Sequence, residues 1–177
     1  MRKIASWSLA SITIMLSISS DAASLLENAK AETSVTYPST RVTNLVDCDE
    51  KSAWNSGSFA PASVFIEMAN SKPISFIRLI PNQTPAGKTT HEILVSGGGN
   101  IFRPADKILE EFTRDGVPII RTFDPPLKGV KKIWIITRKS PSWVAWYEIQ
   151  AYSSLKEMES GCKNLLEETK INRQNAP

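Results

Sequence analysis

Short runs of apolar and β-branched residues alternate with turn-forming residues through most of the chain. Gly, Pro, Asn or Asp separate the runs, and the Asp115-Gly116 pair between two of them is a hairpin signal. This spacing is typical of a β-sandwich or barrel and predicts an all-β fold. The runs are Ser63–Met68, Ile74–Ile80, Thr89–Ser96, Lys107–Thr113, Pro118–Phe123, Lys132–Thr137 and Trp146–Tyr152.

Both ends of the chain depart from this pattern. Arg2 and Lys3 precede an uncharged, mostly apolar stretch that ends near Ser20-Asp21-Ala22. This order is typical of a secretory signal peptide, so we predict a signal at residues 1–22, with an uncleaved N-terminal anchor as the alternative. Residues 23–40 are interpreted as an N-terminal leader, with a short helix around residues 25–30.

A helical spacing replaces the strand pattern after Tyr152. It predicts a short C-terminal helix and tail over residues 154–177, following the β-domain of residues 41–153. Gly161 is expected to weaken this helix. The apolar positions that carry the spacing are Leu155, Met158, Cys162, Leu165 and Leu166.

Composition removes several function classes. The 177 residues carry a formal charge of only +3, which does not indicate a nucleic-acid partner. A single histidine and two cysteines exclude a His-rich zinc site and a four-cysteine metal site. After signal removal no remaining stretch is long and apolar enough to span a membrane.

The predicted export determines the redox state that we expect for the two cysteines. Cys48 and Cys162 both survive signal removal, and in an oxidising compartment they are expected to pair. The bridge would tie the start of the domain to the segment after its last strand. Two free, buried thiols are the alternative.

Four stretches, taken in order, resemble the discoidin domain, also called the coagulation factor five/eight type C domain. They are an opening acidic segment at 44–54, a strand pair at 64–68 and 74–79, a strand at 87–96 that ends in Ser before a Gly-rich turn, and a closing Trp143 followed by Glu148-Ile149-Gln150-Ala151-Tyr152. Family 32 carbohydrate-binding modules are similar. The resemblance implies an eight-stranded antiparallel jelly-roll β-sandwich with both termini at one end.

The resemblance also implies a structural calcium site. Calcium requires six to eight oxygen ligands, and the acidic opening loop together with the closing glutamate would supply them. The alternative is an Asx-type turn with solvated carboxylates. Cys48 stands where the family usually has Gly, which is expected to reshape the loop. The candidate ligands of Ca2+ are Asn44, Asp47, Asp49, Ser52 and Glu148.

Loops at one end of the sandwich hold sugar in members of the family. The corresponding loops are residues 55–61, 81–88, 97–103 and 138–142. Trp54 and Trp143 match positions that the family usually packs in the core, so we expect both to be buried. The candidate ligand-binding residues are Asn55, Asn82, Gln83, Phe102, Arg103 and Arg138.

These features favour a secreted or periplasmic, non-catalytic protein that binds carbohydrate on a cell surface or a polysaccharide. His91 lies inside a strand-like run and is interpreted as a packed residue, so Ser-His-Asp chemistry has little support. The alternative is an adhesion module for protein or anionic lipid. That module would use loop aromatics and the basic residues Lys128, Lys131, Lys132, Arg138 and Lys139.

Overall fold

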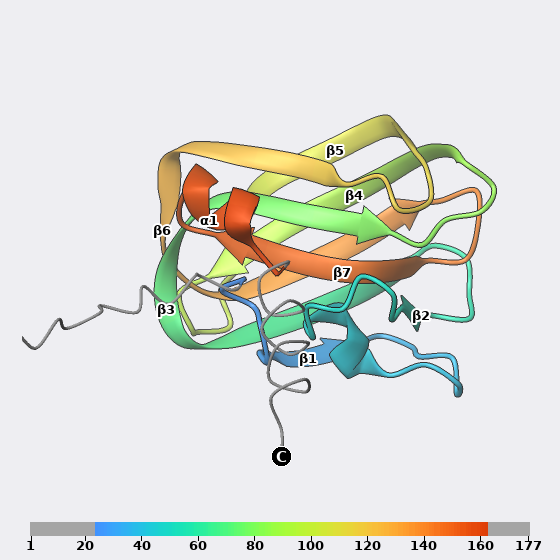
Figure 1. Cartoon of the computed structure of the whole chain (residues 1–177), viewed down its shortest axis with the longest axis horizontal. Helices are drawn as coiled ribbons and strands as arrows, with labels where there is room; N and C mark the ends of the chain where they lie inside the picture. The colour runs from blue at the N-terminus through green and yellow to red at the C-terminus, as the bar shows by residue number, and fades with distance from the viewer. Residues whose placement is uncertain (1–23, 163–177) are drawn as a thin grey trace, which may run out of the picture.

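Two long strands give the molecule its shape in the computed structural model, which describes residues 24–162 (Figure 1). β3 (Ala62–Pro81) and β6 (Ile119–Lys139) run antiparallel beside each other, and their register shifts between Glu67 and Phe76. Both strands bend at this point, at the left edge of Figure 1, and pass from one sheet into the other. Each pair of runs that the sequence separated, 63–68 with 74–80 and 118–123 with 132–137, is therefore one continuous strand.

Each of the two bent strands contributes one half to each of two antiparallel sheets. The five-stranded sheet has the order β1 (Lys30–Thr33), β3, β6, β4 (Gly87–Ser96) and β5 (Arg103–Thr113). The other sheet has the order β2 (Trp54–Asn55), β7 (Ala145–Tyr152), β3 and β6. The predicted antiparallel β-sandwich is confirmed. Within residues 24–162 it is divided into seven strands rather than the eight expected.

The core lies between the two sheets. Alternate residues of β3, such as Val64 and Ile66, and of β6, such as Ile133 and Ile135, are fully or almost fully buried. This period of two is the reason that these segments form half-buried strands. The 3-10 helix η1 (Val42–Leu45) adds Leu45 to the same core.

The segment interpreted as a leader belongs to the sandwich over the residues that the structure describes. Lys30–Thr33 pairs with β3, and Leu26 is fully buried in the core. The Leu25 N–H donates to the Ala151 carbonyl over 2.8 Å. The expected helix around residues 25–30 is wrong, because turns precede β1 there. The predicted signal at residues 1–22 lies outside the described residues.

The C-terminal helix is present but short. α1 (Leu155–Ser160) begins at Ser154, whose side chain accepts from the Glu157 N–H, while the Glu157 carboxylate accepts from Ser153. This reciprocal pairing is a capping arrangement. Gly161 ends the helix instead of lying within it. Leu165 and Leu166, which were predicted to continue it, lie outside the described residues.

The predicted disulfide is confirmed. Cys48, in the loop after η1, is bonded to Cys162, which follows α1 and lies 114 residues further along the chain. The bridge holds the end of α1 against the start of the domain. Among residues 24–162 no helix reaches the length and apolarity that crossing a membrane requires.

Candidate functional site

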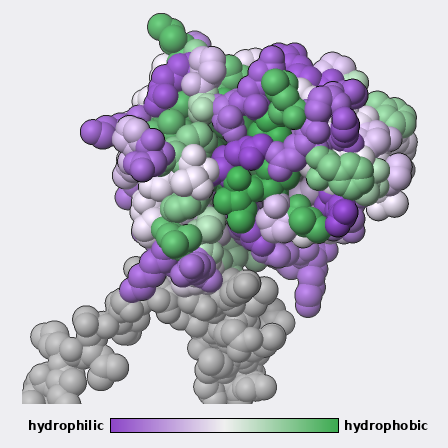
Figure 2. Space-filling model, turned by 90° about the horizontal axis from the view of Figure 1, so that it is seen from above, coloured by the Kyte–Doolittle hydropathy of each residue, from purple (hydrophilic) through white to green (hydrophobic). Residues whose placement is uncertain are grey.

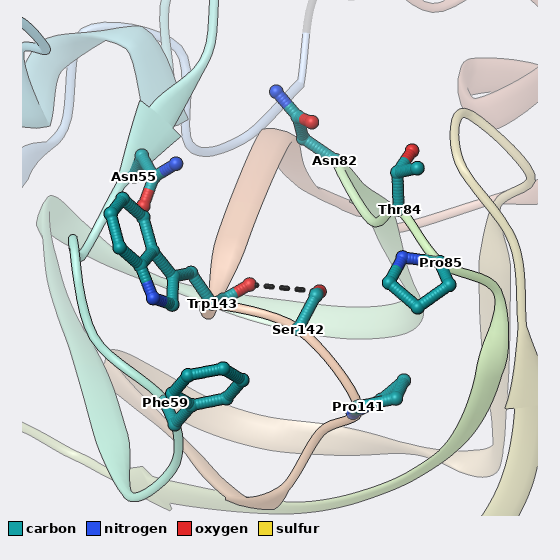
Figure 3. A pocket seen from close by; sticks show the side chains of 8 residues that line it. All are labelled: Asn55, Phe59, Asn82, Thr84, Pro85, Pro141, Ser142 and Trp143. Atoms are coloured by element: carbon teal, nitrogen blue, oxygen red, sulfur yellow. Dashed lines mark hydrogen bonds between the residues drawn. The ribbon is translucent and has the colours of Figure 1, made fainter.

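Three connections meet at one end of the sandwich and enclose a cavity of about 350 Å³. They follow β2, β3 and β6, and backbone hydrogen bonds hold them together. The Ser56 N–H donates to the Val144 carbonyl over 2.9 Å, and the Asn82 N–H donates to the Ala145 carbonyl over 3.1 Å. The cavity is lined by Asn55, Phe59, Asn82, Thr84, Pro85, Pro141, Ser142 and Trp143 (Figure 3).

Two aromatic side chains form the apolar part of this cavity. Trp143 is 43% exposed and Phe59 is 60% exposed. Tyr37 supports Trp143 from beside it, with ring centroids 5.9 Å apart. Trp54 is fully buried as expected, but the expectation that Trp143 is also buried is wrong. Trp143 lies in the short β6–β7 connection, where the next residue, Val144, packs in the core while Trp143 faces the cavity.

Amide and hydroxyl groups form the polar part of the cavity. In Figure 3, Asn55, Asn82 and Thr84 lie on one side, while Phe59 and Pro141 lie on the other. The Asn55 Oδ1 accepts from the Gly57 N–H over 2.7 Å, which fixes the orientation of this amide. An amide offers both donors and an acceptor, so this side of the cavity can pair with hydroxyl groups of a ligand.

Gln83 supports the cavity from inside the protein instead of lining it. Its side chain is buried and accepts from the Thr113 hydroxyl over 2.8 Å. Its backbone N–H donates to Oδ1 of Asp115 over 2.9 Å. Gln83 thus fixes the β3–β4 loop on which Asn82 and Thr84 are placed.

The other three candidate ligand residues do not line this cavity. Phe102 packs edge-on against Trp134, and Arg138 is paired with Glu92 over 2.9 Å. Arg103 pairs with Val95 near the far end of β4, whereas the cavity lies near the start of β4. A ten-residue strand is about 30 Å long, so the 97–103 loop lies at the opposite end from the cavity. The expectation of four loops at one end therefore holds for three of them.

The acidic opening loop is folded around its own side chains. Asp47 Oδ1 accepts from the Asp49 N–H over 3.0 Å, and its Oδ2 accepts from the Ser52 hydroxyl over 2.9 Å. The Asn44 amide donates to the Ala53 carbonyl. Cys48 adopts φ 60, the left-handed conformation that Gly usually supplies, so its replacement of Gly does not prevent this loop geometry.

Glu148 gives the strongest indication that a cation would fit beside this loop. Its side chain is fully buried, and among residues 24–162 neither carboxylate oxygen has a hydrogen-bond partner. Burial, followed by the nearby Asp47 carboxylate, raises the pKa of Glu148 to about 9, while the adjacent Cys48 amide acts in the opposite direction. A buried carboxylate without a partner is costly, and a cation would relieve that cost.

The donor set fits calcium better than a metal held by side chains alone. Within residues 24–162 no three His, Cys, Asp or Glu side chains gather closely enough to bind a metal by themselves. Calcium accepts backbone and amide carbonyl oxygens as ligands, so the loop backbone would have to complete the set. Asp47 and Glu148 would supply the charge, and the ion would hold the opening loop against β7.

His91 is a packed residue, as predicted. Its Nδ1 lies 3.0 Å from the Thr137 hydroxyl and its Nε2 lies 2.9 Å from the Thr89 hydroxyl. Burial, with a smaller effect from Arg121, lowers the pKa of His91 to about 4. Both ring nitrogens are therefore occupied inside the protein, and neither faces the cavity.

Ion pairs largely neutralise the basic residues that suggested an anionic lipid. Lys131 is paired with Glu67, Arg138 with Glu92, and Lys139 with Glu110. Three of the five predicted members of the basic patch thus face a carboxylate, which weakens attraction to an anionic surface.

No protein-family model and no curated protein matches the chain. Solved structures do match. The family 32 carbohydrate-binding module of C. perfringens NanJ, in complex with galactose, has a TM-score of 0.61 at 15% identity, over 70% of this chain and 92% of that one. A second module from Clostridium perfringens, in complex with GalNAc-β-1,3-galactose, has a TM-score of 0.63 at 19% identity, over 73% and 99%. A pectin-binding carbohydrate-binding module has a TM-score of 0.60 at 24% identity, over 71% and 90%.

Identities this low establish the fold alone. The bent central strands, the antiparallel order and the strand-end loops agree with that likeness. The chain therefore has the discoidin-like, galactose-binding-like β-sandwich fold that family 32 carbohydrate-binding modules share.

Proposed function

We propose that the chain is an exported, non-catalytic carbohydrate-binding module that holds sugar in the cavity beside Trp143. The observation that carries this proposal is the pairing of two exposed aromatic rings, Trp143 and Phe59, with the amides of Asn55 and Asn82 in one cavity. A sugar ring has an apolar C–H face that packs on an aromatic plane and hydroxyl groups that pair with amides.

The cavity is built to bind without reaction. Trp143 is held by Tyr37, the Asn55 amide is fixed by its own loop, and Asn82 is fixed through Gln83 and Asp115. Such preorganisation reduces the entropy lost on binding. The lining residues include no carboxylate, histidine or cysteine, so the cavity offers neither an acid/base pair nor a strong nucleophile.

Two further proposals accompany this function. The Cys48–Cys162 disulfide supports an oxidising, extracellular or periplasmic location. The orphaned Glu148 carboxylate beside Asp47 supports a structural calcium ion, which would stabilise the opening loop without touching the sugar.

Calorimetric titration of the oxidised protein with galactose, N-acetylgalactosamine, GalNAc-β-1,3-galactose and pectin oligosaccharides tests the function. We expect binding of at least one of these sugars and its loss in Trp143→Ala. Phe112→Ala is the matched control, because Phe112 is a 58% exposed aromatic on β5, outside the residues that line the cavity. If binding survives Trp143→Ala, the sugar binds at another surface of the protein.

Absence of binding across the whole panel with folded protein would refute the carbohydrate proposal. Salt-sensitive binding to vesicles of phosphatidylserine and phosphatidylcholine would then favour a lipid partner instead.

A further inference from the structure

The outer face of the five-stranded sheet carries aromatic side chains where a solvent-facing sheet usually carries polar ones. Phe65 on β3 and Trp134 on β6 are cross-strand partners, and Leu94 on β4 is the partner of Trp134 on its other side. Phe102 packs edge-on against both rings, with centroids 6.1 Å from Phe65 and 5.6 Å from Trp134. These four residues are all half-buried and form one apolar row across the sheet.

Two hollows adjoin this row and share Trp134. One has a volume of about 300 Å³ and contains Phe65 and Phe102, and the other has a volume of about 280 Å³ and contains Pro61 and Ile136. Ser34 and Ser63 line both hollows, so each hollow combines the indole with the same two serine side chains. An aromatic ring between two hydroxyl-lined hollows suits a ligand that continues past the ring.

Short segments of the chain join the residues of the hollows to those of the sugar cavity. Phe59 lines the cavity and Pro61 lines the nearer hollow, and two residues span less than 8 Å. A second connection runs from Ser34, which lines both hollows, to Tyr37, which supports Trp143. A ligand that leaves the cavity over Phe59 would therefore reach Pro61 and the nearer hollow within a short distance.

The two charged residues that line the hollows are each paired with an opposite charge, and the Lys132 ammonium lies over the Phe65 ring, 5.8 Å from its centroid. Glu32 is paired with Lys30 over 2.7 Å, and Arg138 is paired with Glu92 over 2.9 Å. A charged polymer would gain little from groups that already have partners, whereas hydroxyl groups would pair with the serines. On the face that Figure 2 shows, hydrophilic side chains divide the apolar patches.

We propose that the cavity beside Trp143 and the sheet face around Trp134 form one track that binds a neutral polysaccharide chain. This inference rests on the proposed sugar cavity and adds the length and charge of its ligand. The cavity holds one end of the bound segment, and the chain runs over Phe59 and Pro61 to the indole of Trp134. Affinity therefore rises with the number of sugar units.

The test compares β-linked galactose oligomers of two and six units by calorimetry, on wild type and three variants. Trp134→Ala removes the ring on the sheet face. Because Trp134 also supports Phe102, Ser63→Gln provides a second variant that narrows both hollows and leaves the rings in place. Phe112→Ala is again the control, and thermal melting of each variant verifies its fold.

We expect the hexamer to bind wild type about fivefold or more tightly than the dimer, a gain of about 1 kcal/mol. We expect Trp134→Ala and Ser63→Gln to abolish this gain and to leave the affinity for the dimer unchanged. The control Phe112→Ala keeps both the gain and the affinity for the dimer. Added salt leaves hexamer binding unchanged.

Each contrary result overturns a different statement. Equal affinity for the two oligomers, or a length gain that survives both variants, refutes the track and leaves the sugar cavity in place. Stronger, salt-sensitive binding of polygalacturonate or chitosan hexamers refutes the neutral class. No binding of either galactose oligomer by wild type refutes the track, and absence of binding across the whole sugar panel as well refutes the cavity.

Discussion

The ring of Trp143 packs against the ring of Tyr37, with the ring centroids 5.9 Å apart and the ring planes at 42° to each other. Tyr37 lies ahead of β2, in the segment that the sequence assigned to a leader, while Trp143 follows β6. The backbone also joins Tyr37 to the site, because its N–H donates to the Asn55 carbonyl over 2.8 Å. The N-terminal segment thus contributes to the candidate sugar cavity.

The first prediction concerns this contact. Tyr37→Ala leaves Trp143 without its neighbour, so the indole samples other rotamers and must be ordered again when sugar binds. We expect sugar affinity to fall about 3- to 10-fold, which corresponds to the worth of an aromatic pair. Titration calorimetry measures the change. Tyr37→Phe retains the ring and is expected to bind as wild type does, so equal losses in both variants would contradict this explanation.

The second prediction concerns Asp115, which fixes the loop carrying Asn82. Its Oδ1 accepts from the Gln83 N–H, and its Oδ2 accepts from the Tyr147 hydroxyl over 3.4 Å. Asp115→Ala is expected to weaken sugar binding several-fold while the protein stays folded, because a hydrogen bond to a charged group is worth about 1.5–3 kcal/mol. Affinity and melting temperature are measured together. Unchanged affinity with a lowered melting temperature would assign Asp115 a purely structural role.

The third prediction concerns the disulfide. The bridge closes a loop of more than 100 residues, and the chain-entropy model gives it about 4–5 kcal/mol of stability. We expect the double variant Cys48→Ser, Cys162→Ser to lose a free energy of this order in urea unfolding. Wild type unfolded with a reducing agent serves as the comparison. A loss below about 1 kcal/mol would show that native packing, not the bridge, holds α1 in place.

The fourth prediction concerns calcium and Glu148. Without a cation, Glu148→Gln removes a buried carboxyl group whose pKa is raised to about 9, so we expect the variant to be more stable than wild type at pH 7 by about 1–3 kcal/mol. With calcium at 100 times its dissociation constant, wild type gains about 2.7 kcal/mol and the variant gains little. Thermal melts in chelator and in calcium measure both effects. If the variant gains as much stability from calcium as wild type does, Glu148 is not part of the calcium site.

The fifth prediction concerns pH. The pKa of His91 is about 4 in the folded protein, against an ordinary value near 6.5, so the unfolded chain binds a proton that the folded chain excludes. The stability contributed by neutral His91 is complete above pH 6.5 and decreases as the pH falls toward 4. The slope is at most about 1.4 kcal/mol per pH unit.

Comparison with His91→Gln isolates this effect. Glu148 titrates with the opposite sign, because its pKa is raised, but it is present in both proteins and cancels in the difference. We expect the difference in free energy of unfolding between wild type and variant, measured with urea, to decrease from pH 6.5 to pH 4. If this difference in free energy of unfolding does not depend on pH, the folded protein accommodates a charged His91.

The sequence determined those parts of the protein that depend on local pattern. Runs of β-branched and aromatic residues between turn signals identified the strands at 89–96 and 146–152, because these side chains favour extended backbone. The count of two cysteines and the predicted export led to one disulfide, because no other pairing was available. The packed state of His91 followed from its place within a strand-like run.

Tertiary structure decided what depends on distance across the fold. No local signal reveals that 63–68 and 74–80 form one bent strand, because the bend depends on two sheets packing over one core. Nor could the sequence separate the 97–103 loop from the other three, since strand order decides which end each loop occupies. Trp143 was expected in the core because it matches a position that the resembled family usually packs there, and the sequence does not distinguish a core position from an exposed binding position. Only the packing of Tyr37 on one side and the open cavity on the other made that distinction.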